Sequence, residues 1–290
     1  INEGDSIIAV TEDDDTMIVS NNKDYSIDYE AITSPALLDR KPERILMLGW
    51  NKRSPVLIDE LDKHVKDGSL LKVVANHSYP GKMIKIIKPK LNSLEIEFIE
   101  ADTTDKYLLT SLDPASFDHI ILQSEYEDVG VQQADAQTLV TLLHLRNISN
   151  STKKDLNIVS EMLDNQNRRL AEVTKADDFI VSDNVLSLLM SQVSENKYLM
   201  DVFYKLFGSK ESGIYIKPVT GYLKIGKPVN FYTVLESARQ QNEIALGYRI
   251  ISEKDDENSA HGVIVNPLKS DMIKFNEEDK IIVLSDEDFR

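Results

Sequence analysis

Several carboxylates stand at the carboxyl ends of three apolar segments of this sequence. They are Asp102, Glu125, Glu127, Asp128, Glu161 and Asp164. In an open parallel sheet the carboxyl ends of the strands meet at one edge, and ligands bind at that edge. Carboxylate oxygens are the ligands that a hard cation such as Ca²⁺ prefers. The pattern therefore predicts a calcium site formed by Asp102, Glu125, Asp128, Glu161 and Asp164, with a hydrated acidic rim as the alternative.

The turn GWNKRS, at residues 49–54, is the second candidate site. A dinucleotide site has the pattern G-x-G-x-x-G, which lets the backbone approach a pyrophosphate closely. Only Gly49 of that pattern is present, and Asn76 stands where an acid would hold the ribose hydroxyls. NAD is therefore not expected. Gly49, Asn51, Lys52 and Arg53 stay candidates for a weaker anion site at a helix start; the alternative is that Gly49 only permits a tight turn.

An alternation of strands and helices positions both candidate sites. Apolar strands are predicted at 44–51, 70–76, 94–102, 117–125, 156–163 and 177–183, and helices at 54–65, 105–112 and 134–148. This order predicts an α/β fold with a Rossmann-like, doubly wound parallel sheet. One long apolar helix is expected over 184–207, either as a partner contact or as a core helix. Beyond Gly208, short strands around one helix predict a small α+β domain.

A sequence pattern that occurs twice suggests how the chain is divided. GDSIIAVTEDD at 4–14 and EDKIIVLSDED at 278–288 share an Asp-x-Ile-Ile strand start and an acidic end. Chance similarity between two short strands is the alternative. The repeated pattern predicts that residues 1–20 are the terminal strand of a preceding module and that residues 21–42 are a linker. A Rossmann-like N-lobe with a crossover helix would then span 43–208, and a C-lobe 209–290.

Composition excludes several classes of function. The 290 residues contain 33 Lys and Arg against 49 Asp and Glu, a net charge of −16. Nucleic acid is therefore not an expected partner, because phosphates repel such a chain. There is no cysteine, which excludes disulfides, thiolate metal sites and cysteine nucleophiles. No apolar run approaches the ~18 residues of a membrane span, so no direct membrane insertion is expected. The chain lacks a starting Met, and we expect it to be part of a longer protein.

Four stretches together resemble a known family. They are RILMLGWN, ADDFIVSDNVLSLLMSQVSENKYLMDVFYKLF, NEIALGYRI and VIVNPLKSDMIKFNEEDKIIVLSDE. The chain is similar to the cytosolic, TrkA-like RCK domains of CASTOR/POLLUX-type ion channels over residues 44–290. The resemblance implies an RCK N-lobe and C-lobe that assemble into a ring beneath a pore, with ligand binding changing the open probability. It also implies a cation ligand, calcium foremost, at the strand ends where Glu125, Asp128 and Glu161 fall.

The resemblance leads to a specific expectation about function. We expect a non-catalytic gating-ring module at the cytoplasmic face of a membrane, in a homo-oligomer that is a tetramer of the full-length chain. A pore domain would lie upstream in the same protein. The alternatives are an NAD(P)-dependent oxidoreductase and a soluble TrkA-like regulator of a separate potassium transporter. A ring-building copy that senses no ligand is a further alternative.

Overall fold

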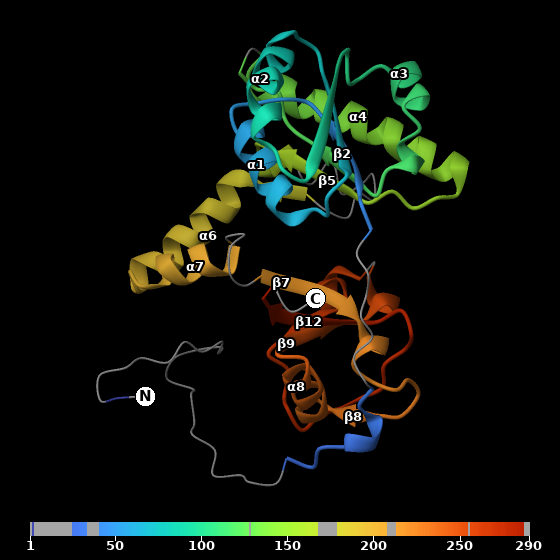
Figure 1. Ribbon diagram of the computed structural model, residues 1–290, viewed down its shortest axis with the longest axis vertical. Helices are drawn as coiled ribbons and strands as arrows, with labels where there is room; N and C mark the ends of the chain where they lie inside the picture. Colours follow the sequence, from blue (N-terminus) through green and yellow to red (C-terminus); the bar gives the residue numbers. More distant parts are fainter. Residues whose placement is uncertain are drawn as a thin grey trace. The chain divides into compact units, whose positions relative to one another are not determined.

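The computed structural model describes residues 2, 25–33, 41–127, 129–167, 179–207, 213–254 and 256–286. They form two compact units (Figure 1). The N-lobe consists of the described residues up to Met200, starting at 41. The C-lobe combines 25–33 with the described residues from Asp201 onward. The division falls between Met200 and Asp201, whereas the sequence analysis placed the boundary after 208. The terminal strand predicted within 1–20 lies outside the described residues, apart from Asn2.

The N-lobe is built on a six-stranded parallel sheet with the order β3-β2-β1-β4-β5-β6. The strands are β1 (Arg44–Leu48), β2 (Ser69–Ala75), β3 (Leu94–Glu100), β4 (His119–Leu122), β5 (Ile158–Met162) and β6 (Phe179–Val181). This confirms the predicted Rossmann-like, doubly wound sheet. The strand order reverses between β1 and β4, and in such sheets the crevice for ligands opens at the carboxyl ends of these two strands.

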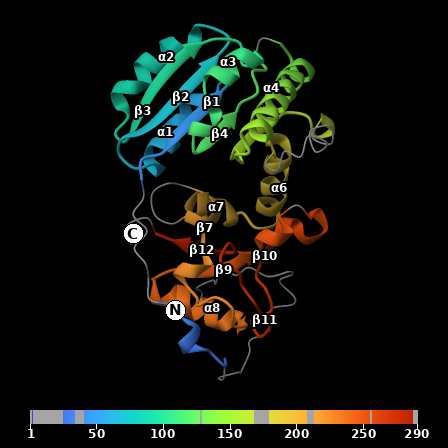
Figure 2. The same cartoon turned by 90° about the vertical axis from the view of Figure 1, so that its right-hand side faces the viewer.

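Helices cover both faces of this sheet. Figures 1 and 2 show α1 (Ser54–His64) and α2 (Tyr79–Ile87) on one face, and α3 (Lys106–Ser111) and α4 (Val131–Thr152) on the other. Ile58 of α1 packs in a cluster with Met47 of β1. Leu142 of α4 packs in a second cluster with Leu48 of the same strand. The apolar run of β1 is therefore buried on both sides, as expected for a central parallel strand.

Two elements differ from the sequence analysis. No helix was assigned between Asn76 and Leu94, yet α2 forms there, with Pro80 in its first turn, where a missing N–H costs no hydrogen bond. The single helix predicted over 184–207 was wrong. Two helices form instead, α6 (Ser182–Glu195) and α7 (Leu199–Phe207). Asn196 has an extended backbone that ends α6, and its side chain accepts a hydrogen bond from Tyr198 N at 3.1 Å.

The C-lobe is a small α+β unit, as predicted. One sheet has the order β10-β9-β12-β7, and a second pairs β11 with β8. Its elements are β7 (Gly213–Pro218), β8 (Val229–Asn230), α8 (Phe231–Gln240), β9 (Ile244–Arg249), β10 (Val263–Val265), β11 (Met272–Ile273) and β12 (Lys280–Ser285). The four-stranded sheet is antiparallel throughout. Val234 of α8 packs against Ile281 and Val283 of β12 in the core.

Part of the predicted linker packs as part of the C-lobe. Ala31 is buried in the C-lobe core, and Ile32 forms a β-bridge with Leu223. The Asn230 side chain donates hydrogen bonds to two backbone carbonyls of this segment, each at 3.1 Å. Residues 25–33 therefore precede the N-lobe in the sequence but belong to the C-lobe in the fold.

Candidate functional site

The turn between β1 and α1 brings the backbone very close to β4. Gly49 has φ +91°, and a Cβ placed there would lie 2.2 Å from the carbonyl oxygen of Gln123. Only glycine permits both this backbone conformation and this approach. The Gly49 N–H donates to the Val74 carbonyl at 2.8 Å, which ties the turn to β2. Gly49 thus performs the structural role that the sequence analysis gave as the alternative to ligand binding.

Three carboxylates from β5 and the β4–α4 loop contact the turn. They are Glu125, Glu127 and Glu161. Glu125 accepts the Trp50 N–H at 3.1 Å, and Glu127 accepts the Lys52 N–H at 3.0 Å. Glu161 forms an ion pair with Arg53. The protein's own acids therefore bind the donors that a phosphate would need at this turn.

Asn51 joins the turn to two neighbouring strands. It is completely buried, and its side-chain nitrogen donates to the Ser124 carbonyl at 3.0 Å and to Glu161 at 2.9 Å. Its side-chain oxygen accepts the Arg53 N–H at 2.9 Å. Of the four residues proposed as anion ligands, Gly49 and Asn51 are thus committed to the fold. The side chains of Lys52 and Arg53 both lie over the Tyr126 ring, at 5.7 and 5.6 Å from its centre.

The predicted calcium ligands are not gathered into one cluster within the described residues. Asp102 accepts hydrogen bonds from the backbone and side chain of Thr104, and Asp164 accepts one from Gln166 N. Glu125 and Glu161 bind different parts of the turn. No three His, Asp or Glu side chains in the described part of the chain come together so that they could hold a metal ion. Asp128 lies outside the described residues.

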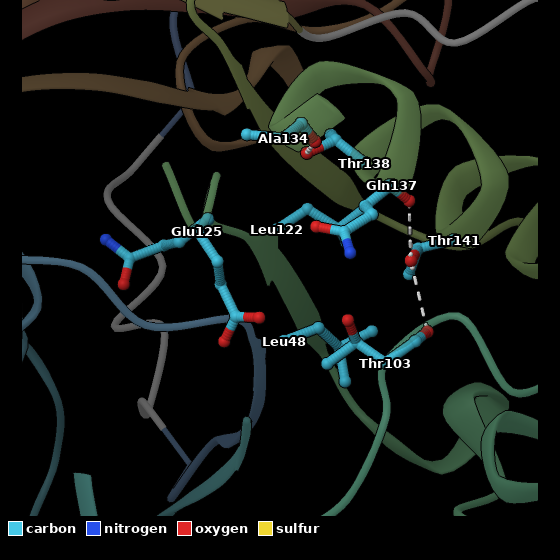
Figure 3. Close-up of a pocket in the computed structure, with 9 residues that line it drawn as sticks. Leu48, Thr103, Leu122, Glu125, Ala134, Gln137, Thr138 and Thr141 are labelled. Carbon is cyan, nitrogen blue, oxygen red and sulfur yellow. Dashed lines mark hydrogen bonds between the residues drawn. The ribbon is translucent and has the colours of Figure 1, made fainter. Parts of the chain in front are cut away.

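Glu125 lies beside a small cavity between β1, β4 and α4 (Figure 3). The cavity measures about 10 Å³, which is room for one water molecule and excludes an organic ligand. Thr141 closes one side by donating to the Thr103 and Gln137 carbonyls at 3.1 and 3.0 Å. Burial raises the pKa of the Glu125 carboxyl above its ordinary value, although His77 and the N–H groups of Trp50 and Asn76 act in the opposite direction.

The raised pKa of Glu125 predicts a specific pH dependence of stability. Above pH 4.5, its ordinary pKa, the folded protein retains a proton that the unfolded chain has released, so raising the pH destabilises the fold. Glu125→Gln removes this titration. We expect the free energy of unfolding of Glu125→Gln to rise relative to wild type as the pH increases from 4.5 into the window of the raised pKa. Urea unfolding followed by Trp50 fluorescence measures it.

The matched control for this prediction is Glu95→Gln, which changes an exposed carboxyl on β3. Its free energy difference from wild type should not show the same rise. A Glu125→Gln difference that stays constant or shrinks as the pH rises would contradict the prediction.

The sequence analysis missed Asp135, a buried carboxylate on α4. It is fully inaccessible and accepts hydrogen bonds from Leu163 N at 2.9 Å, Asp164 N at 3.0 Å and Asn167 Nδ2 at 2.8 Å. Asp135 thereby fixes residues 163–167, directly after β5. One signal could have revealed it: Asp135 lies three and seven residues before Thr138 and Leu142, on the same buried helical stripe.

Comparisons with known proteins extend over both lobes. The chain is 26% identical to the probable ion channel CASTOR of Oryza sativa subsp. japonica, covering 99% of this chain and 35% of the relative. It is 26% identical to the ion channel CASTOR of Lotus japonicus, covering 99% and 37%, and 24% identical to the probable ion channel POLLUX of Arabidopsis thaliana, covering 98% and 38%. This chain resembles the CASTOR and POLLUX ion channels. It spans little more than a third of their length.

One solved structure has a fold similar to that of this chain. The human SLO3 gating ring matches with a TM-score of 0.56 and 10% identity, over 84% of this chain and 44% of that chain. At this identity the likeness shows the fold alone. No protein family model matches the chain. None of the helices in the described part of the chain combines the length and apolar character that crossing a bilayer requires.

Proposed function

We propose that this chain is a non-catalytic gating-ring module of a cation channel and lies at the cytoplasmic face of a membrane. One observation carries the proposal: both lobes, over 98–99% of the chain, align with CASTOR and POLLUX ion channels. The likeness to the SLO3 gating ring supports it at the level of the fold. In this proposal the pore belongs to another part of the same protein. A ligand that binds one ring geometry more tightly than another shifts the ring toward the first geometry. This shift changes the open probability of the pore.

The α6 and α7 helices support assembly with further copies of the chain. Val185, Leu186, Leu188 and Met190 of α6 are between 46% and 63% exposed. On α7, Met200, Tyr204 and Phe207 are exposed as well. Exposed apolar side chains gathered on one helix mark protein interfaces. We propose that these two helices contact neighbouring subunits, and that the full-length chain forms a tetramer.

Charge on α6 should therefore disrupt assembly. We expect Leu186→Glu combined with Met190→Glu to lower the molar mass of the particle, because two carboxylates would be buried in an apolar contact. Light scattering coupled to size-exclusion chromatography measures the mass. The control is Val56→Glu, since Val56 is 65% exposed and lies on α1. If the double variant assembles like wild type, α6 does not form the interface.

The alternatives differ in how the site supports them. A dehydrogenase would place a dinucleotide phosphate on the β1–α1 turn, but Glu125 and Glu127 bind the N–H groups of Trp50 and Lys52. A TrkA-like regulator of a separate transporter has the same fold, and the channel similarity favours the gating ring.

Calcium sensing stays a prediction. Calorimetric titration with calcium tests it, with Glu161→Gln and Glu125→Gln weakening the binding if the strand ends hold the ion.

A further inference from the structure

The longest stretch of the chain without an acidic residue lies between Asp67 and Glu95. It contains five lysines, which are Lys72, Lys82, Lys85, Lys88 and Lys90. The last four lie on α2 and on the short 3-10 turn that follows it, η3 (Lys88–Lys90). A chain with a net charge of −16 therefore carries a locally cationic segment in its N-lobe.

The inner side of α2 is fixed to β3, the edge strand of the sheet (Figures 1 and 2). Ile84 is buried in one cluster with Ile96 of β3. Gly81 faces the Phe98 ring so closely that an added Cβ would lie 2.9 Å from it. After the helix, the Lys88 ammonium donates to the Ile96 carbonyl at 3.2 Å. The position of α2 on the N-lobe is therefore well determined by packing.

The outer side of α2 and the turn after it carry exposed lysines with an apolar side chain between them. Lys82, Lys85 and Lys90 are exposed. Ile86 is 57% exposed and lies one helical turn after Lys82, on the same face. We call Lys82, Lys85, Ile86 and Lys90 the α2 surface.

The fold does not neutralise the positive charge of the α2 surface. Its lysines have no ion-pair partner among the described residues. Glu95 and Glu97 of β3 point to the face of the sheet opposite α2. On the neighbouring α1, Asp59 and Glu60 are paired with Lys63. Charges farther away are screened over about 8 Å at physiological ionic strength. The α2 surface is therefore free to attract an anionic partner.

The chemistry of the α2 surface favours lipid headgroups over a protein partner. Protein interfaces are enriched in arginine and depleted in lysine, and the cations of this surface are all lysines. The side chains stand on the outside of a helix, which suits a layer of headgroups better than a single small anion. Lysine clusters on amphipathic helices are typical of anionic lipid binding, and an exposed apolar side chain among them can reach the acyl boundary.

We propose that the α2 surface binds anionic lipids at the surface of a bilayer. The lysines contact the phosphate and carboxylate groups of the lipids, and Ile86 contacts the boundary of the acyl chains. The helix does not insert, because its apolar side is already packed on β3. The proposed function places the chain beside a membrane, and this contact would hold the N-lobe against it. Lipid binding itself does not depend on gating.

The test is co-sedimentation of the purified chain with vesicles of equal parts phosphatidylserine and phosphatidylcholine. We expect binding that weakens as salt is added. Lys82→Glu with Lys85→Glu should weaken it at least about tenfold, since each lysine near an anionic surface contributes about fivefold. Ile86→Ser should weaken it without changing any charge. The matched control is Lys106→Glu with Lys153→Glu, at exposed positions on α3 and at the end of α4.

Three results would overturn the proposal. The first is equal binding to vesicles of phosphatidylcholine alone. The second is a Lys82→Glu and Lys85→Glu variant that binds vesicles as tightly as the control. The third is a lower particle mass of that variant in light scattering without lipid, because the α2 surface would then be a contact between copies of the chain. Circular dichroism distinguishes loss of binding from loss of fold.

The proposed function is tested separately, by the particle mass of the α6 double variant. A chain that assembles through α6 but does not bind anionic vesicles overturns only the lipid contact. A chain that binds the vesicles but does not assemble overturns only the gating ring.

Discussion

Replacing Gly49 by alanine is expected to destabilise the N-lobe by about 2–5 kcal/mol. The left-handed backbone at this position costs a non-glycine residue roughly 1–2 kcal/mol. The Cβ would also lie 2.2 Å from the Gln123 carbonyl oxygen, and that contact forces the turn away from β4. Overpacking of this kind typically costs about 1–3 kcal/mol more. Urea unfolding followed by Trp50 fluorescence reports on the N-lobe, because Trp50 is the only tryptophan and is buried beside the turn.

Gly68→Ala separates the two causes. Gly68 also has a positive φ, +86°, but the nearest atom to an added Cβ is Pro42 Cγ at 3.9 Å. The free energy of unfolding of Gly68→Ala should therefore fall only by the backbone contribution, about 1–2 kcal/mol. Equal losses for the two variants would show that the close approach of the turn to β4 is not what requires Gly49.

Replacing Glu243 by alanine is expected to destabilise the C-lobe by about 3–5 kcal/mol. Glu243 is 7% exposed and accepts hydrogen bonds from the Tyr222 hydroxyl, the Lys217 ammonium and the Ser285 hydroxyl at 3.0 Å. Burial and the adjacent Glu243 carboxylate raise the pKa of Tyr222, so its hydroxyl stays a donor. Removing the carboxylate leaves the Lys217 charge and the Tyr222 hydroxyl without this acceptor, and leaves the Ser285 hydroxyl only the Asp286 carbonyl at 3.4 Å. The loss is measured by urea unfolding followed by circular dichroism.

Glu278→Ala is the matched control, because it removes the same charge from an exposed position in the C-lobe. It should change the free energy of unfolding by less than about 0.5 kcal/mol. Glu243→Gln keeps the size of the side chain and should recover part of the loss, since its amide oxygen can still accept one hydrogen bond. A Glu243→Ala loss no larger than that of Glu278→Ala would contradict this account of the C-lobe core.

The order of strands and helices was predictable because each N-lobe strand is an apolar run bounded by turn residues. The spacing of apolar residues, with a period of about 3.6 residues, also predicted α1, α4 and α8. Sequence periodicity could not show that Asn196 divides 184–207 into two helices, because the apolar spacing continues on both sides of it. Nor could it place 25–33 on the C-lobe, since that packing depends on contacts with residues ~200 positions away in the sequence, such as Asn230.

The candidate site was predicted in location but not in its internal contacts. Glu125, Glu127 and Glu161 contact the GWNKRS turn, whereas Asp102 and Asp164 accept hydrogen bonds within their own loops. A sequence does not reveal that Glu125 and Glu127 face backbone N–H groups instead of each other, because that depends on the conformation of the β4–α4 loop. The resulting hydrogen bonds give these acids a structural role that the carboxylate pattern alone does not distinguish from a cation site.

Single-channel recording of the full-length protein tests the proposed function most directly. The variant to compare with wild type is Leu186→Glu with Met190→Glu, which alters the ring and not the pore. The account predicts a change of about fivefold or more in the equilibrium between open and closed states, as coupling free energies of about 1–3 kcal/mol produce, with unchanged single-channel conductance. An unchanged open probability in a variant whose assembly is disrupted would contradict the claim that this chain gates a pore.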